Sequence, residues 1–133
     1  MQNLQSVFKQ STIELFEKFA IRTDDIKSFV KCDMKSFNKY GECWVILTDS
    51  EICSVSENGE FIRKSLSGIK EIYVDSYISS GCIIAVCDDE EITLGYFSLA
   101  VAKTVEKFVS SVQRAKTDMP EKADAPVYSD TEF

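Results

Sequence analysis

Between residues 26 and 96 the sequence alternates short apolar runs with turn signals, and this pattern constrains the fold more than any other feature. Short runs bounded by Gly, Asn, Asp and Ser are typical of β-strands. Seven strands are predicted, over residues 26–35, 43–48, 51–56, 61–66, 69–77, 82–87 and 91–96. The middle of the chain is therefore expected to be β-structure built from consecutive hairpins.

Asn58-Gly59 is the strongest local signal, because a two-residue hairpin turn needs positive backbone angles that Asn and Gly tolerate best. Such a turn would place Val55 opposite Ile62. The first predicted strand, 26–35, also fits a helical spacing of apolar residues. A half-buried strand with outward lysines is the preferred interpretation.

Two amphipathic helices are predicted at the ends of the strand region. Apolar residues at three- and four-residue steps predict a helix over roughly residues 3–20. They are Leu4, Val7, Phe8, Leu15, Phe16 and Phe19. This helix either docks on its own domain or is reserved for a partner protein or a membrane surface. Ser98 can cap a closing helix, whose apolar face comprises Val101, Val105, Phe108, Val109 and Val112.

The length of 133 residues suits one domain with a single core. We divide it into an N-terminal amphipathic helix (1–22), a β-domain with its C-terminal helix (23–116) and an acidic tail (117–133). The tail holds both prolines and a net charge of -4, which is typical of a linker or disordered end. The start of the chain lacks a secretory signal and no run is long enough for a bilayer, so an intracellular soluble chain is expected.

The charged and reactive residues exclude several functions. A net charge of -7 disfavours general nucleic-acid binding. The chain has no histidine, which removes the commonest metal ligand and proton shuttle. Five cysteines, at positions 32, 43, 53, 82 and 87, lie in apolar stretches and are expected to be reduced core thiols. Only Cys82 and Cys87 approach the spacing of a zinc ligand pair, and on a strand they would point to opposite faces.

Several stretches resemble a bacterial domain found ahead of ATP-binding-cassette exporters. Residues 40–49 (Tyr-Gly-Glu-Cys-Trp-Val-Ile-Leu-Thr-Asp) resemble its Gly-Glu-x-Trp-Leu-Val-Val-Thr run. Residues 69–72 and 77–81 are similar to its Ile-x-Glu-x strand and Val-Gly-Gly-Gly turn, and residues 96–100 to its Arg-Phe-Ser-Asn-Ala-Leu helix start. The resemblance covers about residues 26–115. This chain departs from the pattern with Ser79 and Ser80 in place of glycines, and with Leu99 in place of a polar residue.

The resemblance implies an α+β fold of the pleckstrin-homology-like type: a seven-stranded antiparallel barrel or sandwich capped by a C-terminal helix. In that family the domain is cytoplasmic and is followed by an acidic linker, membrane helices and a nucleotide-binding domain. The expected function is therefore that of a non-catalytic accessory domain acting through protein contacts, whose partner is the rest of a transporter chain or another protein. No cofactor is expected, and the ATPase of a parent transporter would lie in a segment outside these residues.

Two alternatives remain. Lipid-binding relatives of the barrel collect basic residues around the first strand, and here Lys27, Lys31, Lys35 and Lys39 lie there. They suggest an independent module for anionic lipid headgroups or a peptide, although lysines on an outward strand face also keep a sheet edge soluble. An enzyme would have to use the acidic run 88–91, which solvated hairpin-tip charges explain more simply.

Overall fold

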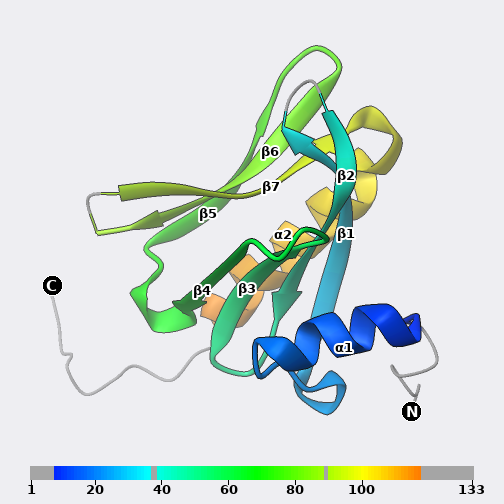
Figure 1. Cartoon of the computed structure of the whole chain (residues 1–133). Coiled ribbons are helices and arrows are strands. Elements are labelled where there is room, and N and C mark those ends of the chain that lie inside the picture. Colours follow the sequence, from blue (N-terminus) through cyan, green and yellow to red (C-terminus); the bar gives the residue numbers. More distant parts are fainter. Residues whose placement is uncertain (1–7, 37–38, 89, 118–133) are drawn as a thin grey trace, which may run out of the picture.

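The computed structural model describes residues 8–36, 39–88 and 90–117 (Figure 1). Within these ranges it is an α+β protein with one antiparallel sheet of seven strands. The strands are β1 (Ser28–Ser36), β2 (Lys39–Leu47), β3 (Glu51–Ser56), β4 (Phe61–Ser65), β5 (Glu71–Ser76), β6 (Ser80–Cys87) and β7 (Glu90–Ser98). The helices are α1 (Gln10–Lys18) and α2 (Ala102–Thr117), with short helical turns η2 (Thr23–Asp25), η3 (Leu66–Gly68) and η4 (Leu99–Val101).

This order confirms the predicted series of seven strands followed by a C-terminal helix. α2 extends to Thr117, the first residue of the predicted tail, and the rest of that tail lies outside the described residues. Of the helices in the described ranges, none has the length and apolar character needed to cross a bilayer.

The sheet consists of two halves that meet at a single residue pair. Its strand order is β4-β3-β2-β1-β7-β6-β5. β1 pairs with β2 along most of its length, but with β7 only at Met34 and Tyr96. From this junction the halves, β1–β4 and β5–β7, diverge (Figure 1).

The predicted barrel is therefore not closed, since β4 and β5 stand at opposite edges of the sheet. The physical reason lies in the chain that joins them. Leu66 and Ile69, from the link between β4 and β5, are buried in the core beneath the sheet. The link between the two edge strands therefore packs into the core.

A second contact ties β1 to the end of β7. The backbone N–H of Ser98 donates to Oδ1 of Asp33 over 2.8 Å, and the Ser98 hydroxyl donates to Oδ2 of the same carboxylate. The Ser98 Oγ also accepts from the N–H of Ala100 over 3.2 Å, which confirms the predicted cap. One serine thus starts the helical segment and holds it against β1.

α2 packs on the inner side of the sheet between its two halves. Its buried residues are four of the five predicted for the apolar face, Val105, Phe108, Val109 and Val112, whereas the fifth, Val101, lies in η4 and is partly buried against the same core. They belong to an inner core that includes residues of both halves, among them Val30, Val45, Ile83 and Leu94. Burying side chains of this size contributes about 1.5–3 kcal/mol each. The side chain of Gln113 donates to the carbonyl of Ile72 over 2.7 Å, so α2 also supplies a hydrogen bond to the edge strand β5.

α1 lies over the outer face of the first half (Figure 1). Phe8 and Phe16 pack into an outer core that contains Trp44, Ile46 and Val55. The rings of Phe16 and Trp44 meet edge to face, with their centroids 5.8 Å apart. The described part of the N-terminal segment therefore packs on its own sheet.

The helix is shorter than the predicted span of residues 3–20. It begins at Gln10, and residues 1–7 lie outside the described ranges. It ends because Ala20 adopts a positive φ of 61°. The N–H groups of Ala20 and Ile21 then donate to the carbonyls of Glu17 and Phe16, each over 3.0 Å. This left-handed ending, usually made by glycine, turns Ile21 into the outer core.

The β3–β4 hairpin differs from the predicted two-residue turn. The N–H of Ser56 donates to the carbonyl of Glu60 over 2.9 Å, and the N–H of Gly59 donates to the carbonyl of Ser56 over 3.0 Å, so the loop has three residues. Only Gly59, with a φ of 91°, is left-handed, whereas Asn58 is not. This is the geometry of a type I turn followed by a glycine bulge.

The longer loop shifts the strand pairing by one residue. Val55 lies opposite Phe61, and the predicted pairing with Ile62 is wrong. A shift of one residue exchanges the two faces of a strand. Phe61 therefore packs against the outer core, where its ring stacks on Phe19 at 4.3 Å, and Ile62 packs against the inner core.

Gly95 allows β7 to approach β1 and β2 closely. A methyl group on its Cα would lie 3.0 Å from Sγ of Cys32 and 3.2 Å from Cγ2 of Val45. Glycine within a strand often marks such a close backbone approach. The crossing of the two halves thus depends on the absence of a side chain at this position.

We predict that Gly95→Ala lowers the free energy of unfolding by about 1–3 kcal/mol, because the added methyl overpacks the crossing. Gly68→Ala is the matched control, since no heavy atom lies within 4 Å of the position of its added methyl. It should change the free energy by about 1 kcal/mol or less. Urea denaturation of both variants measures the difference, and equal effects would contradict the prediction.

We also predict that Phe16→Ala exposes the outer core. Trp44 is the single tryptophan of the chain and is 5% exposed, so its fluorescence reports on the cover that α1 provides. The variant should shift tryptophan emission to longer wavelength and lose about 3–5 kcal/mol of stability. Glu17→Ala, an exposed neighbour on α1, should do neither. Unchanged emission from Phe16→Ala, in samples with native circular dichroism, would show that α1 does not cover Trp44.

Candidate functional site

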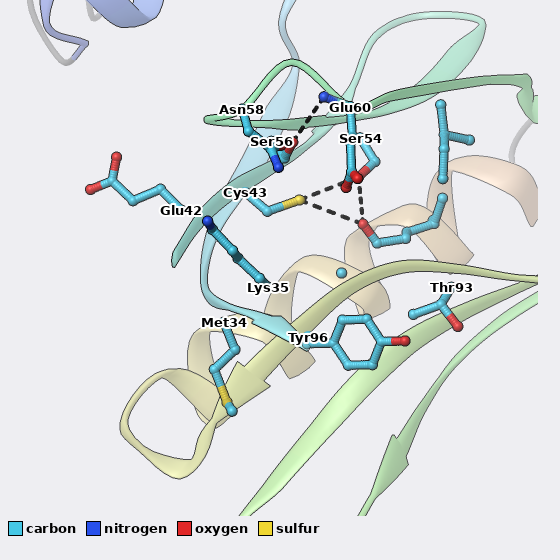
Figure 2. Close-up of a pocket in the computed structure, with 13 residues that line it drawn as sticks. Met34, Lys35, Glu42, Cys43, Ser54, Ser56, Asn58, Glu60, Thr93 and Tyr96 are labelled. Atoms are coloured by element: carbon cyan, nitrogen blue, oxygen red, sulfur yellow. Dashed lines mark hydrogen bonds between the residues drawn. The ribbon is translucent and has the colours of Figure 1, made fainter. Parts of the chain in front are cut away.

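A pocket of about 110 Å³ opens where β7 leaves β1 (Figure 2). One wall comes from β1, β2 and the β3–β4 hairpin, and the other comes from β7. Its lining residues are Met34, Lys35, Glu42, Cys43, Ser54, Ser56, Asn58, Glu60, Ile62, Thr93, Leu94, Gly95 and Tyr96. The pocket therefore lies between the two halves of the sheet, beside their junction.

A bulge in β7 creates the polar floor of this pocket. Ile83 pairs with Gly95 and Ile84 with Thr93, so Leu94 is an extra residue in the ladder. The Leu94 carbonyl accepts a hydrogen bond from the hydroxyl of Ser54, which is buried. An extra residue in a bulge has no regular ladder partner. The contact with β3 therefore satisfies a buried backbone group and joins the two halves of the sheet.

Cys43 completes this polar contact. Its Sγ lies 3.3 Å from Oγ of Ser54 and 3.7 Å from the carbonyl oxygen of Leu94 (Figure 2). Burial raises the pKa of the Cys43 thiol, the hydrogen bond with Ser54 opposes this, and the nearby carboxylate of Glu60 adds to it. A thiol must ionise to act as a nucleophile. Cys43 is therefore suited to a structural role at neutral pH.

Polar side chains surround the mouth of the pocket. The side chain of Lys35 lies over Gly41, in the space that a Cβ would need. The Ser56 hydroxyl contacts Asn58 and accepts from the N–H of Glu60 over 3.0 Å. Ligand pockets usually enclose about 300–1,000 Å³. This pocket is smaller, and it suits ordered water or a few atoms of a larger molecule.

The four lysines proposed as an anionic-ligand patch are exposed and are spread from one end of the β1–β2 pair to the other. Lys27 lies 3.5 Å from Asp49 at one end of the β1–β2 pair. Lys39, at the other end, pairs with Ser36. These ends are separated by most of the nine residues of β1, roughly 25–30 Å at about 3.3 Å per residue.

The two central lysines have separate environments. Lys31 forms a 2.7 Å ion pair with Glu42 and lies 5.9 Å from the centre of the Trp44 ring, on the side of the outer core. Lys35 is an extra residue of β1 between Met34 and Ser36, and it lines the pocket. The lysines at every fourth position thus have different neighbours along β1, where the register changes, and their binding of an anionic ligand stays a prediction.

The cysteines are all free, and four of them are buried. Cys82 and Cys87 lie on opposite faces of β6, as an odd separation on a strand predicts. Burial raises the pKa of the Cys32, Cys53 and Cys82 thiols. In the part of the chain that the structure describes, no group of three or more His, Cys, Asp or Glu side chains is placed to hold a metal ion.

The acidic run 88–91 lies at the β6–β7 hairpin. Asp88 has a positive φ of 53°, a conformation that Asp tolerates better than most residues. Asp89 lies outside the described residues. Cys87 and Glu90 close the two-residue turn, and Glu91 continues along β7. The run is thus divided between a turn and a strand face.

Comparisons with protein-family models, with curated proteins and with solved structures find no match for this chain. The site must be understood from its own residues. Sequence reasoning missed Ser54 and Leu94, since nothing in the chain order shows that a serine on one strand faces a bulge 40 residues later. Gly95 was the available signal, because a glycine inside an apolar strand often marks a bulge or a close approach.

We predict that Ser54→Ala lowers the free energy of unfolding by about 1–3 kcal/mol, because the Leu94 carbonyl loses its main donor in a buried position. Ser67→Ala, whose hydroxyl contacts only the exposed Ser65 hydroxyl among the described residues, should cost about 0.5 kcal/mol or less. Chemical denaturation of the two variants provides the comparison. A Ser54→Ala protein as stable as Ser67→Ala would mean that the contact does not hold the halves together.

Proposed function

We propose that this chain is a pleckstrin-homology-like, non-catalytic accessory domain that forms the N-terminal cytoplasmic part of an ATP-binding-cassette exporter and acts through protein contacts. The main support is the order of its elements together with the positions of the resembling stretches. Seven antiparallel strands are followed by one helix that packs between the two halves of the sheet. This is the order that the sequence resemblance implies, with an open sheet in place of a closed barrel.

The resembling stretches occupy matching structural positions. Residues 40–49 cover most of β2 and the start of the following turn. Residues 77–81 form the turn into β6, where the N–H of Tyr77 donates to the carbonyl of Ser80 over 2.7 Å. Residues 96–100 contain the end of β7 and the Ser98 cap of η4. The turn at 77–81 and the helix start at 96–100 support the proposal, whereas only the second half of 69–72, likened to a strand, lies in β5.

The departures from the family pattern have simple physical explanations. Ser79 and Ser80 stand in place of glycines, and neither has a positive φ. Glycine is needed in a turn chiefly where φ is positive, so serine fits this one. Leu99 stands in place of a polar residue and is 62% exposed, so packing does not dictate the residue type there. These substitutions are compatible with the proposed relationship.

The chemistry of the described residues favours contacts over bond-making. Burial raises the pKa of the thiol of Cys43, the cysteine that lines the pocket between the sheet halves. That pocket is small, and the hydroxyl of its buried serine, Ser54, donates to the Leu94 carbonyl. In contrast, both faces of the first half-sheet are used for packing, which makes the domain a rigid support for surface contacts.

The test of the exporter proposal is the coding sequence beyond residue 133. We expect an in-frame segment with several runs of about 20 apolar residues, followed by a nucleotide-binding domain with a glycine-rich phosphate loop that ends in Lys and Ser or Thr. A stop codon with no transporter gene in the same operon would contradict the proposal. If the segment exists, deletion of residues 1–117 should alter transport while the purified remainder still hydrolyses ATP.

A further inference from the structure

The outer side of β5–β7 carries tyrosines and carboxylates on one face. Tyr73 and Asp75 are two residues apart on β5 and therefore share a face. Asp75 lies opposite Cys82 of β6, and Cys82 lies opposite Tyr96 of β7. Because directly paired residues share a face, Tyr96 lies on the same face as Asp75. Glu91 belongs to it as well, because the Tyr73 hydroxyl donates to its Oε2 over 3.3 Å.

Tyr77 extends this face beyond the end of β5. Its hydroxyl donates to Oδ2 of Asp75 over 2.8 Å, and the residue is 51% exposed. We refer to Tyr73, Asp75, Tyr77, Glu91 and Tyr96 as the tyrosine face. Ile78, the next residue along the chain, is 97% exposed and adds apolar surface beside it.

Neither helix of the described chain packs on the tyrosine face. Ile72 and Val74, which alternate with its β5 residues, point to the inner core that contains α2. α1 packs on the other half of the sheet (Figure 1). The second half-sheet thus has one covered side and one side without a covering element among the described residues.

The tyrosine face lies in the most acidic part of the sheet. Residues 69–98 contain one basic residue and six acidic ones, Lys70 against Glu71, Asp75, Asp88, Asp89, Glu90 and Glu91. In the described ranges, no Lys or Arg forms an ion pair with Asp75 or Glu91. Desolvation and the Glu91 carboxylate raise the pKa of Tyr73, and the hydrogen bond to Asp75 raises that of Tyr77. The electrostatic potential at the tyrosine face is therefore negative.

We propose that the tyrosine face binds an extended, arginine-bearing segment of a partner protein. A guanidinium group can stack on a tyrosine ring and donate two parallel hydrogen bonds to a carboxylate. Asp75 and Glu91 each accept a hydrogen bond from a tyrosine hydroxyl. At each position one arginine can therefore contact a carboxylate and a tyrosine. This inference names a surface for the contacts of the accessory domain and rests on that proposed role.

The sheet register gives the spacing of the two arginines. Asp75 lies opposite Cys82 and Glu91 opposite Val86, four residues apart along β6 and on strands that flank it. At about 3.3 Å per residue and about 4.8 Å per strand, the two backbone positions are roughly 16 Å apart. An extended peptide covers this distance in about five residues. Side chains alternate along an extended peptide, so two arginines that face the sheet must be an even number of residues apart. Arginines at positions i and i+4, about 13 Å apart along the peptide, should therefore reach both carboxylates through their long side chains.

The experiment uses the whole chain and the peptide Gly-Arg-Gly-Ser-Gly-Arg-Gly, and binding is followed by two-dimensional NMR of the ¹⁵N-labelled protein. We expect the largest shift changes at residues of β5–β7 that carry the tyrosine face. A peptide with both arginines replaced by citrulline keeps the shape and loses the charge, and it should not bind. The double variant Asp75→Asn, Glu91→Gln should weaken binding about tenfold or more.

The matched control is the double variant Glu14→Gln, Glu17→Gln, which removes the same charge from the exposed side of α1. It should weaken binding by no more than about twofold, as expected for general attraction between screened surface charges. Equal losses in the two double variants, binding of the citrulline peptide, or absence of binding at millimolar peptide would each overturn the proposal. These results are independent of the coding sequence beyond residue 133, so failure here and failure of the exporter assignment are distinguishable.

Discussion

The structure depends on how β7 crosses β1. The two sheet halves share one ladder pair, Met34 and Tyr96, so most of their attachment must come from other groups. Side chains supply it: Asp33 accepts two hydrogen bonds from Ser98, and Ser54 donates to the Leu94 carbonyl. These contacts lie on different strands of the first half. They fix the angle of the crossing in a way that one residue pair could not.

Once the crossing is set, the remaining architecture follows from covering apolar surface. The inner sides of the two halves face α2, which buries four apolar residues there. The outer side of the first half is covered by α1 through Phe16 and Trp44. The outer side of the second half remains as the tyrosine face, and the small pocket occupies the gap that α2 does not reach.

The sequence predicts the elements well because they depend on local periodicity. The seven strands and the face of α2 were correct for this reason. The register of the strands and the closure of the sheet depend on contacts between residues far apart in the chain. Local sequence patterns do not show these contacts. The β3–β4 turn takes three residues, where the Ser56 hydroxyl accepts from the Glu60 N–H. The surroundings of the lysines show the same dependence, since the register of β1 is irregular near Lys35.

The hydrogen bond from Gln113 to the Ile72 carbonyl has a consequence for self-association. Exposed edge strands can template pairing with another chain, and this route leads to aggregation. On β5 a backbone acceptor is already occupied by a side chain of α2. On β4, the opposite edge, Arg63 is bound to Glu51 and to the carbonyl of Phe19 at the end of α1. Contacts with both helices thus engage the two edge strands, which disfavours their pairing with another chain.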